Sequence, residues 1–219
     1  DVAAALAGLG VDARLLGAAD RQRAGVFVVE AEAAAGERLV VEVHGRDAHD
    51  TQLLTTFWRA GWYRQPSASV ALGRMRQVEH EALLTLLAGQ AEVAVPSVVA
   101  VGSTDRDDAV LVLARTGDPL AAHPGGCTET VAREAWQVLD RLHRRSISHG
   151  QIDDGSVQLA GPPERRVVGL SDWSGAQVAS GDHRFRVDEV QVLVTTALGL
   201  GAAASVAVAA DALGPDRTA

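Results

Sequence analysis

Side chains that can move a proton or hold a metal ion gather in the second half of the chain. His149, Asp153 and Asp154 follow a predicted long helix, and Asp172 follows a predicted pair of short strands. An imidazole or carboxylate within hydrogen-bond reach of a hydroxyl group can accept its proton, and carboxylate oxygens are the protein ligands that Mg²⁺ prefers. By residue type, His149, Asp153 and Asp154 are therefore candidates for a base, and Asp172 is a candidate metal ligand.

Each carboxylate also has a structural interpretation. Asp172 stands beside Ser174, so it either binds a metal or caps a turn, and the sequence alone leaves both interpretations open. Asp153 and Asp154 precede Gly155, a pattern typical of solvated carboxylates that hold a turn. For Asp153 and Asp154 we favour the structural interpretation.

Composition argues against several other kinds of function. A net charge of −8 and a pI of about 5.3 disfavour a general nucleic-acid binder, which is normally basic. Cys127 is the only cysteine, so no intramolecular disulfide can form, in keeping with a reducing compartment. The seven histidines show no metal-ligand spacing with one another or with Cys127, so we expect no structural zinc site. The first residues lack the charged and apolar regions of a signal peptide.

The elements that must position the candidate residues follow from periodicity and turn signals. We expect a strand-rich first lobe over residues 1–114 and a mainly helical second lobe over 115–219, with the boundary in the loop at 115–119. The predicted helices cover residues 1–9, 47–63, 74–88 and 128–144, with a last long helix from near Val187. The predicted strands cover residues 26–30 and 38–43, which form a hairpin, and residues 93–101, 109–113, 157–159 and 167–170.

Residues 190–210 are nearly uncharged and about long enough to cross a bilayer. They are rich in alanine, glycine and threonine and contain Gln191, whereas leucine and isoleucine dominate membrane spans. We therefore expect a buried core helix here.

The order of these landmarks resembles that of protein kinases. Residues 39–43 (Leu-Val-Val-Glu-Val) stand where kinases carry V-A-I-K, and the helix with Glu79, His80 and Glu81 stands where the αC helix follows. Residues 149–156 (His-Gly-Gln-Ile-Asp-Asp-Gly-Ser) match the frame of the H-R-D-L-x-x-x-N loop. They are closer still to the H-G-D-x-x-x-x-N form of aminoglycoside-phosphotransferase-like kinases.

Two further landmarks fit the same order. Residues 170–175 (Leu-Ser-Asp-Trp-Ser-Gly) stand where D-F-G or its I-D-W variant belongs, and Asp188 opens the predicted last helix. The resemblance implies an α+β, bilobal kinase-like fold. Its N-lobe holds an antiparallel sheet with an αC-like helix, and its reduced C-lobe is mainly helical.

A narrower resemblance rests on residues 43–47 (Val-His-Gly-Arg-Asp) and 78–83 (Val-Glu-His-Glu-Ala-Leu). They are similar to the kinase-like domain of large actinobacterial membrane proteins whose transmembrane region is similar to lysylphosphatidylglycerol synthases. This resemblance implies the cytoplasmic part of a membrane protein at the inner face of the plasma membrane. Its partner would be its own linked membrane domain or another protein, and not nucleic acid.

Most positions that kinases use for phosphoryl transfer carry other residues. Glu42 replaces the lysine that holds the phosphates, and all 20 cations of the chain are arginine, with Arg38 or Arg46 as substitutes. Gln151 replaces the base aspartate and cannot ionise. Ser156 replaces the asparagine that helps to hold magnesium. Of the four positions, only the one at Asp172 keeps its kinase residue type.

The resemblance with these losses implies a pseudokinase that has no catalytic residue, binds ATP weakly or not at all and serves regulation or scaffolding. The first alternative is a divergent small-molecule phosphotransferase in which Glu81 and Asp172 serve Mg–ATP. The second is a purely structural or interaction module.

Individual side chains keep two interpretations at this stage. Glu42 is either a block to nucleotide or an exposed strand residue, and Glu81 either pairs with an arginine or lies on a solvated helix face. The resemblance implies that His149 braces its loop through backbone hydrogen bonds and is not catalytic.

An aromatic and basic segment lies between the third predicted strand and the αC-like helix. One interpretation is a face that docks onto a partner or onto the membrane surface, because aromatic and arginine side chains are favoured at such interfaces. The other interpretation, which we favour, is a stripe of side chains packed on the sheet. The residues of the segment are Phe57, Trp58, Arg59, Trp62, Tyr63 and Arg64, with Arg74 and Arg76 close by.

Overall fold

The computed structural model describes residues 2–23, 25–45, 73–162 and 165–214. The chain forms two compact units, one from Asp1–Ala82 with Ser97–Arg115, the other from Leu83–Pro96 with Thr116–Ala219. A single boundary at residue 114 would have left Leu83–Pro96 in the first unit. The predicted helix over 47–63 lies outside the described residues, as do Arg46 and all six residues of the aromatic and basic segment from Phe57 to Arg64.

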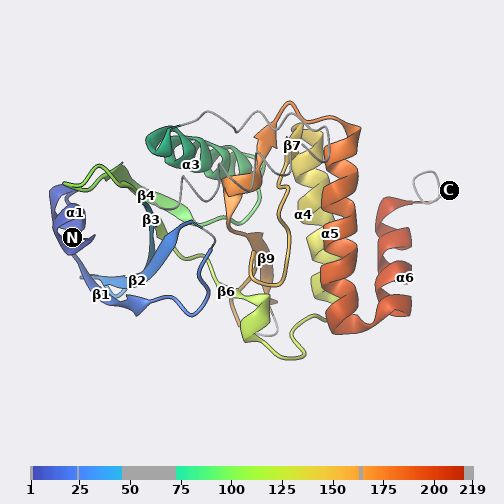
Figure 1. Cartoon of the computed structure of the whole chain (residues 1–219). Coiled ribbons are helices and arrows are strands. Elements are labelled where there is room, and N and C mark those ends of the chain that lie inside the picture. The colour runs from blue at the N-terminus through green and yellow to red at the C-terminus, as the bar shows by residue number, and fades with distance from the viewer. Residues whose placement is uncertain (1, 24, 46–72, 163–164, 215–219) are drawn as a thin grey trace. The chain divides into compact units, whose positions relative to one another are not determined.

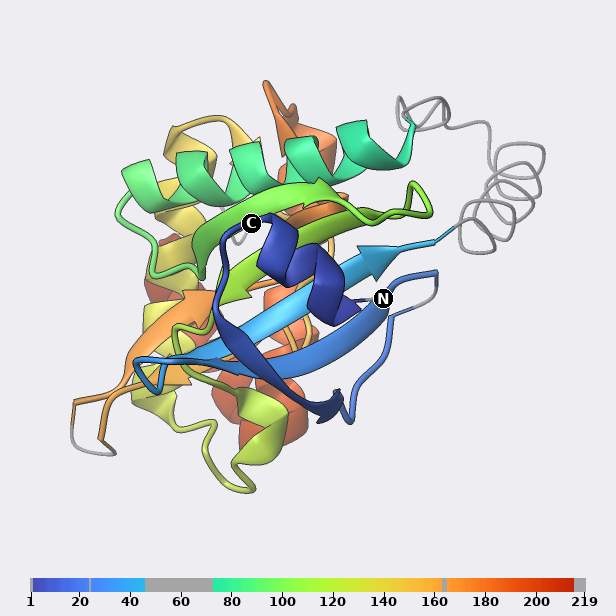
Figure 2. The same cartoon turned by 90° about the vertical axis from the view of Figure 1, so that its left-hand side faces the viewer.

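The first unit is built on a five-stranded sheet with strand order β1-β2-β3-β5-β4, and all of its strand pairs are antiparallel. Figure 2 shows α1 lying across one face of this sheet. The elements are α1 (Val2–Gly8), β1 (Ala13–Ala18), β2 (Phe27–Ala33), β3 (Arg38–His44), β4 (Ser97–Ser103) and β5 (Ala109–Ala114), together with α3 (Arg74–Gln90) as far as Ala82.

The alternation of side chains along β3 assigns each residue to one face of the sheet. Leu39 and Val41 pack with Leu6 of α1 on one face. On the other face, Leu111 of β5 packs with Val78 of α3. Glu42 and His44 alternate with the residues of the α1 face, so they point to the side that α3 covers.

The second unit packs three helices with two small sheets. The helices α4 (Glu129–Arg144), α5 (Asp182–Leu200) and α6 (Ala202–Leu213) lie side by side in Figure 1. A three-stranded sheet has the order β6-β8-β9, and β10 pairs with β7. The strands are β6 (Asp118–Pro119), β7 (Ile147–Ser148), β8 (Val157–Ala160), β9 (Val167–Leu170) and β10 (Gln177–Val178).

The amphipathic pattern of α4 explains why it is central to the second unit. Thr128 caps the helix by accepting a hydrogen bond from the backbone N–H of Val131. The buried face of α4, including Trp136, Leu139 and Leu142, joins the main core of this unit. Its last turn carries three basic residues, which suit the negative end of the helix dipole.

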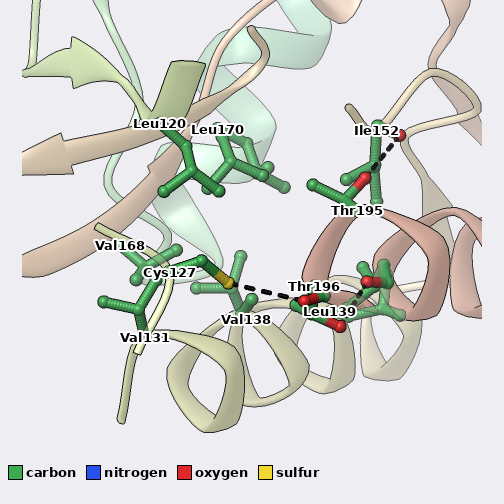
Figure 3. A pocket seen from close by; sticks show the side chains of 13 residues that line it. Leu120, Cys127, Val131, Val138, Leu139, Ile152, Val168, Leu170, Thr195 and Thr196 are labelled. Atoms are coloured by element: carbon green, nitrogen blue, oxygen red, sulfur yellow. Dashed lines mark hydrogen bonds between the residues drawn. The ribbon is translucent and has the colours of Figure 1, made fainter. Parts of the chain in front are cut away.

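Within this core lies a small cavity of about 10 Å³, which has room for roughly one water molecule. Figure 3 shows its lining of Leu, Val and Ile side chains, with Cys127, Thr195 and Thr196 among them. The Cys127 Sγ lies 3.8 Å from the Thr196 carbonyl oxygen, and burial raises the pKa of the thiol. The cavity is a packing gap of the core and is too small for a substrate or cofactor.

The sequence predicted most of the longer elements, but it missed the two-residue strands β6, β7 and β10 and differed from the structure in three larger features. The strand β1 was not predicted, because its exposed residues hide the alternation. The last helix begins at Asp182 and not near Val187. Residues 190–210 do not form one buried helix: Gly201, at φ 87°, separates α5 from α6, and Leu198 is 82% exposed. No helix among the described residues is long and apolar enough to span a membrane.

The burial of Cys127 predicts a thiol that reacts only after unfolding. Because the thiolate is the reactive form, a buried thiol with a raised pKa should react with Ellman's reagent at least about 100-fold more slowly in the folded protein than in guanidinium. As a matched control, Ser103→Cys places an exposed thiol at the end of β4 and should react at once. Rapid, stoichiometric labelling of the wild type in buffer would contradict this packing.

Candidate functional site

A buried charged cluster lies on the α3 side of the sheet, where the kinase resemblance places the phosphate-binding lysine. Glu42 and His44 belong to β3, Glu81 belongs to α3, and Arg23 comes from the connection between β1 and β2. Glu42, His44 and Glu81 are 5%, 6% and 2% exposed. All four residues belong to the first unit, so β3 and α3 determine where the acidic groups lie.

Arg23 joins the two acids. One of its Nη atoms forms an ion pair with Glu42, and the other lies 3.4 Å from Glu81 Oε1. The His44 Nε2 atom lies 4.0 Å from Glu42 Oε2. Removing a carboxylate from water costs several kcal/mol, which a cation in contact can offset. The guanidinium therefore makes the burial of both acids tolerable.

This geometry excludes one interpretation of each glutamate. Glu42 is not an exposed strand residue, and Glu81 is not on a solvated helix face, because Glu81 pairs with an arginine. That arginine is neither of those expected: Arg38 is exposed, and Arg46 lies outside the described residues. The sequence analysis missed Arg23. The chain contains no lysine, so a cation that pairs with buried Glu42 and Glu81 had to be an arginine or a histidine.

In the second unit, Asp188 organises the loop that resembles the catalytic loop of kinases. Its carboxylate is fully buried and accepts hydrogen bonds from the backbone N–H groups of His149, at 2.9 Å, and Gly150, at 2.6 Å. His143 Nε2 lies 3.2 Å from the same carboxylate. Asp188 lies in the second turn of α5 and does not open the helix, contrary to the sequence-based expectation.

Gly150 is required at its position in this loop. Its φ is +79°, and a Cβ atom added there would lie 2.6 Å from the carbonyl oxygen of Gly175. Any other side chain would meet both a backbone clash and a left-handed conformation.

His149 braces the loop. Its Nδ1 accepts a hydrogen bond from the backbone N–H of Gln151, so the ring proton is on Nε2, which donates to the Ser171 carbonyl at 3.0 Å. The ring also meets Trp173 edge-on, with centroids 4.7 Å apart. Burial lowers the pKa of His149, with a partly opposing effect of Asp188. A neutral imidazole with both nitrogens engaged has a structural role, as the resemblance implied.

Three polar residues that follow His149 form hydrogen bonds in or beside the turn, whereas Asp154 is exposed. Asp153 Oδ1 accepts the backbone N–H groups of Gly155, at 3.0 Å, and Ser156, at 2.9 Å. Ser156 is 3% exposed, and its hydroxyl donates to the Asp153 carbonyl. Gln151 accepts a hydrogen bond from the Ser174 hydroxyl at 3.3 Å. These contacts support the structural interpretation of Asp153.

Asp172 has a left-handed backbone conformation with φ 64°, and its Oδ1 accepts a 2.7 Å hydrogen bond from Ser174. This contact supports the turn interpretation. Among the described residues, the cluster of at least three possible metal-ligand side chains is Glu42, His44 and Glu81, and Asp172 is not part of it. A metal-binding role for Asp172 stays a prediction.

Comparisons with known proteins agree with this fold. No model of a known protein family and no curated protein matches the chain. Many solved structures are similar to it, among them that of vaccinia related kinase 3, with 16% identity, a TM-score of 0.50 and 86% of this chain covered. The match covers 64% of the kinase chain, so this chain spans less than two thirds of it. The chain has a protein-kinase-like fold.

The hydrogen bonds of Asp188 predict a large effect of its replacement. Asp188→Asn removes the charge and leaves one of the backbone N–H groups facing an amide, so we expect a loss of about 3 kcal/mol in the free energy of unfolding, measured by urea denaturation. Asp182→Asn, at the exposed first turn of α5, should cost only a few tenths of a kcal/mol. Equal effects of the two replacements would show that Asp188 does not anchor the loop.

The lowered pKa of His149 predicts a dependence of stability on pH. The unfolded state binds a proton near the ordinary value of 6.5, whereas folded His149 resists protonation, so stability is fully present above that pH and falls as the pH drops from 7 towards 5. The contribution is at most about 1.4 kcal/mol per pH unit. Urea midpoints across this range should fall more steeply for the wild type than for His149→Gln, and identical slopes would contradict the assignment.

Proposed function

We propose that this chain is a pseudokinase domain that acts by binding or regulation and has weak or absent nucleotide binding. The observation that carries this proposal is the ion pairing of Arg23 with both Glu42 and Glu81. In a kinase the corresponding cation contacts the phosphates of ATP, and catalysis depends on charge neutralisation there. Here the cation that pairs with Glu81 also pairs with a second acid.

The size of the electrostatic effect supports this proposal. Two like unit charges 4 Å apart repel by about 4 kcal/mol at an effective dielectric constant of 20. A phosphate oxygen brought that close to Glu42 would therefore lose about 4 kcal/mol of binding free energy, which is the difference between micromolar and millimolar affinity. The residues of the cluster therefore do not fit a triphosphate.

The second unit supports the same proposal independently. Gln151 cannot accept a proton, and His149 is neutral, with both ring nitrogens in hydrogen bonds. Asp153 holds the turn through two backbone N–H groups. Two of the groups suited to act as a base, His149 and Asp153, therefore already serve the fold.

The biological context of the proposal rests on the resemblance to actinobacterial membrane proteins. In that context the chain would be the cytoplasmic part of a larger membrane protein at the inner face of the plasma membrane. It would bind a protein partner or regulate its own linked membrane domain. Deleting the chain from the full-length protein and assaying the membrane function tests this role, and an unchanged function would leave only a structural module.

Nucleotide binding is the direct test. We expect no rise in the melting temperature of the wild type with 1 mM ATP and Mg²⁺, because a dissociation constant weaker than millimolar stabilises the fold by less than about 0.4 kcal/mol. A clear rise that Asp172→Ala abolishes, or transfer of labelled phosphate from ATP to any acceptor, would establish an active phosphotransferase instead.

Charge exchange checks that the cluster is the cause. Glu42→Lys should destabilise the fold by about 3–5 kcal/mol, because it places an ammonium group against Arg23 in a buried site. Arg23→Ala combined with Glu42→Lys should recover much of this loss, since lysine can then pair with Glu81. Additive effects of the two replacements would contradict the coupling that the structure predicts.

A further inference from the structure

We propose that Glu42, His44 and Glu81 form a binding site for a divalent transition-metal ion of the Zn²⁺ type, and that this ion displaces the guanidinium of Arg23. The site goes beyond the proposed function, because it does not depend on whether the chain binds nucleotide. Each of the three residues offers one ligand atom, and these atoms all lie within 4.8 Å of one another.

The distances are close to those of a formed site. Nitrogen and oxygen ligands lie about 2.0–2.2 Å from Zn²⁺, so two ligand atoms of one ion are separated by at most roughly 4.4 Å. The His44 Nε2 to Glu42 Oε2 distance of 4.0 Å already falls within this limit. The widest separation needs to shrink by only about half an ångström, which a small side-chain rotation supplies.

The elements of the first unit fix the ligands in advance. Glu42 and His44 are two residues apart on β3, so both point to the same face, and β3 is hydrogen-bonded to a strand on each side. Glu81 approaches from α3, whose Val78 and Ala82 pack on the same sheet. Ligands placed on a central strand and a packed helix require little ordering when an ion binds.

The chemistry of the donor set distinguishes a metal from other cations. Two carboxylates and an imidazole suit Zn²⁺ and similar ions, whereas Mg²⁺ and Ca²⁺ prefer oxygen ligands alone. The cluster already holds a cationic group, since Arg23 pairs with both acids. A divalent ion would bring twice the charge of Arg23 and would also use the imidazole nitrogen of His44.

Arg23 is the member of the cluster that is best placed to leave. Its side chain is 17% exposed, whereas those of Glu42, His44 and Glu81 are 6%, 7% and 2% exposed. It also belongs to a connection between strands, where movement disturbs less packing than it would in β3 or α3. Metal binding would therefore release the β1–β2 connection from its ion pairs with the sheet and the helix.

The experiment measures Zn²⁺ binding to the chelator-treated protein by isothermal titration calorimetry, with Mg²⁺ as a comparison. We expect one Zn²⁺ per chain, no comparable heat with Mg²⁺, and a loss of at least about tenfold in affinity in His44→Gln. His183→Gln removes an exposed histidine of α5 and should bind as the wild type does. Absence of Zn²⁺ binding, or equal binding in His44→Gln, overturns the proposal.

Arg23→Gln provides a result that adventitious binding to surface histidines cannot give. Removing the competing guanidinium should tighten Zn²⁺ binding by about tenfold or more, and unchanged affinity overturns the proposed displacement. If Arg23→Gln does not fold, the Co²⁺ absorption spectrum of the wild type gives a second measurement. Visible d–d bands that His44→Gln abolishes support the site, and bands that persist in His44→Gln overturn it. The proposed function is tested separately by the thermal shift with ATP, so a failure of Zn²⁺ binding and a failure of the proposed function can be distinguished.

Discussion

Both units of this protein must bury carboxylates, and each unit meets that constraint in its own way. In the first unit, Glu42 and Glu81 share the guanidinium of Arg23. In the second unit, Asp188 is surrounded by the backbone N–H groups of His149 and Gly150 and by His143. An unpaired buried charge costs several kcal/mol, which is a large share of the stability of a typical domain. The two arrangements are therefore conditions for the fold as well as features of the candidate site.

The two solutions have different consequences for chemistry. Backbone N–H groups around Asp188 fix a loop and leave no charge to exchange with a ligand. A guanidinium held between two acids is a cation in a buried place, and a ligand can reach those acids only by competing with it. The first unit thus holds two buried carboxylates around one cation, and the second unit keeps an ordered loop in which Gln151 cannot ionise.

The sequence predicted the elements that form apolar, β-branched runs or follow a helical stripe. Strands β2, β3 and β5 were found from such runs, and β5 is buried along its whole length, whereas helices α3 and α4 were found from their buried stripes. It missed β1 because four of its six residues are exposed. The first turn of α5 is polar, so the start of this helix was predicted too late in the sequence. The sequence also did not distinguish the helix break at Gly201 from a glycine that a continuous helix tolerates. Arg23, the shared partner of Glu42 and Glu81, could not be identified from sequence spacing. It is distant in sequence from both acids and comes from the connection between β1 and β2.

The position of the cation explains what this fold has kept from the kinase arrangement. A lysine on β3 would serve two roles: it would tie the sheet to the helix through a glutamate, and it would face phosphate. Here the tie survives, because Arg23 reaches both Glu42 of β3 and Glu81 of α3. We propose that the second role is lost, because the residue on β3 is itself an acid. The cation comes from the β1–β2 connection, so the cluster links the helix to the sheet while β3 itself carries an acid.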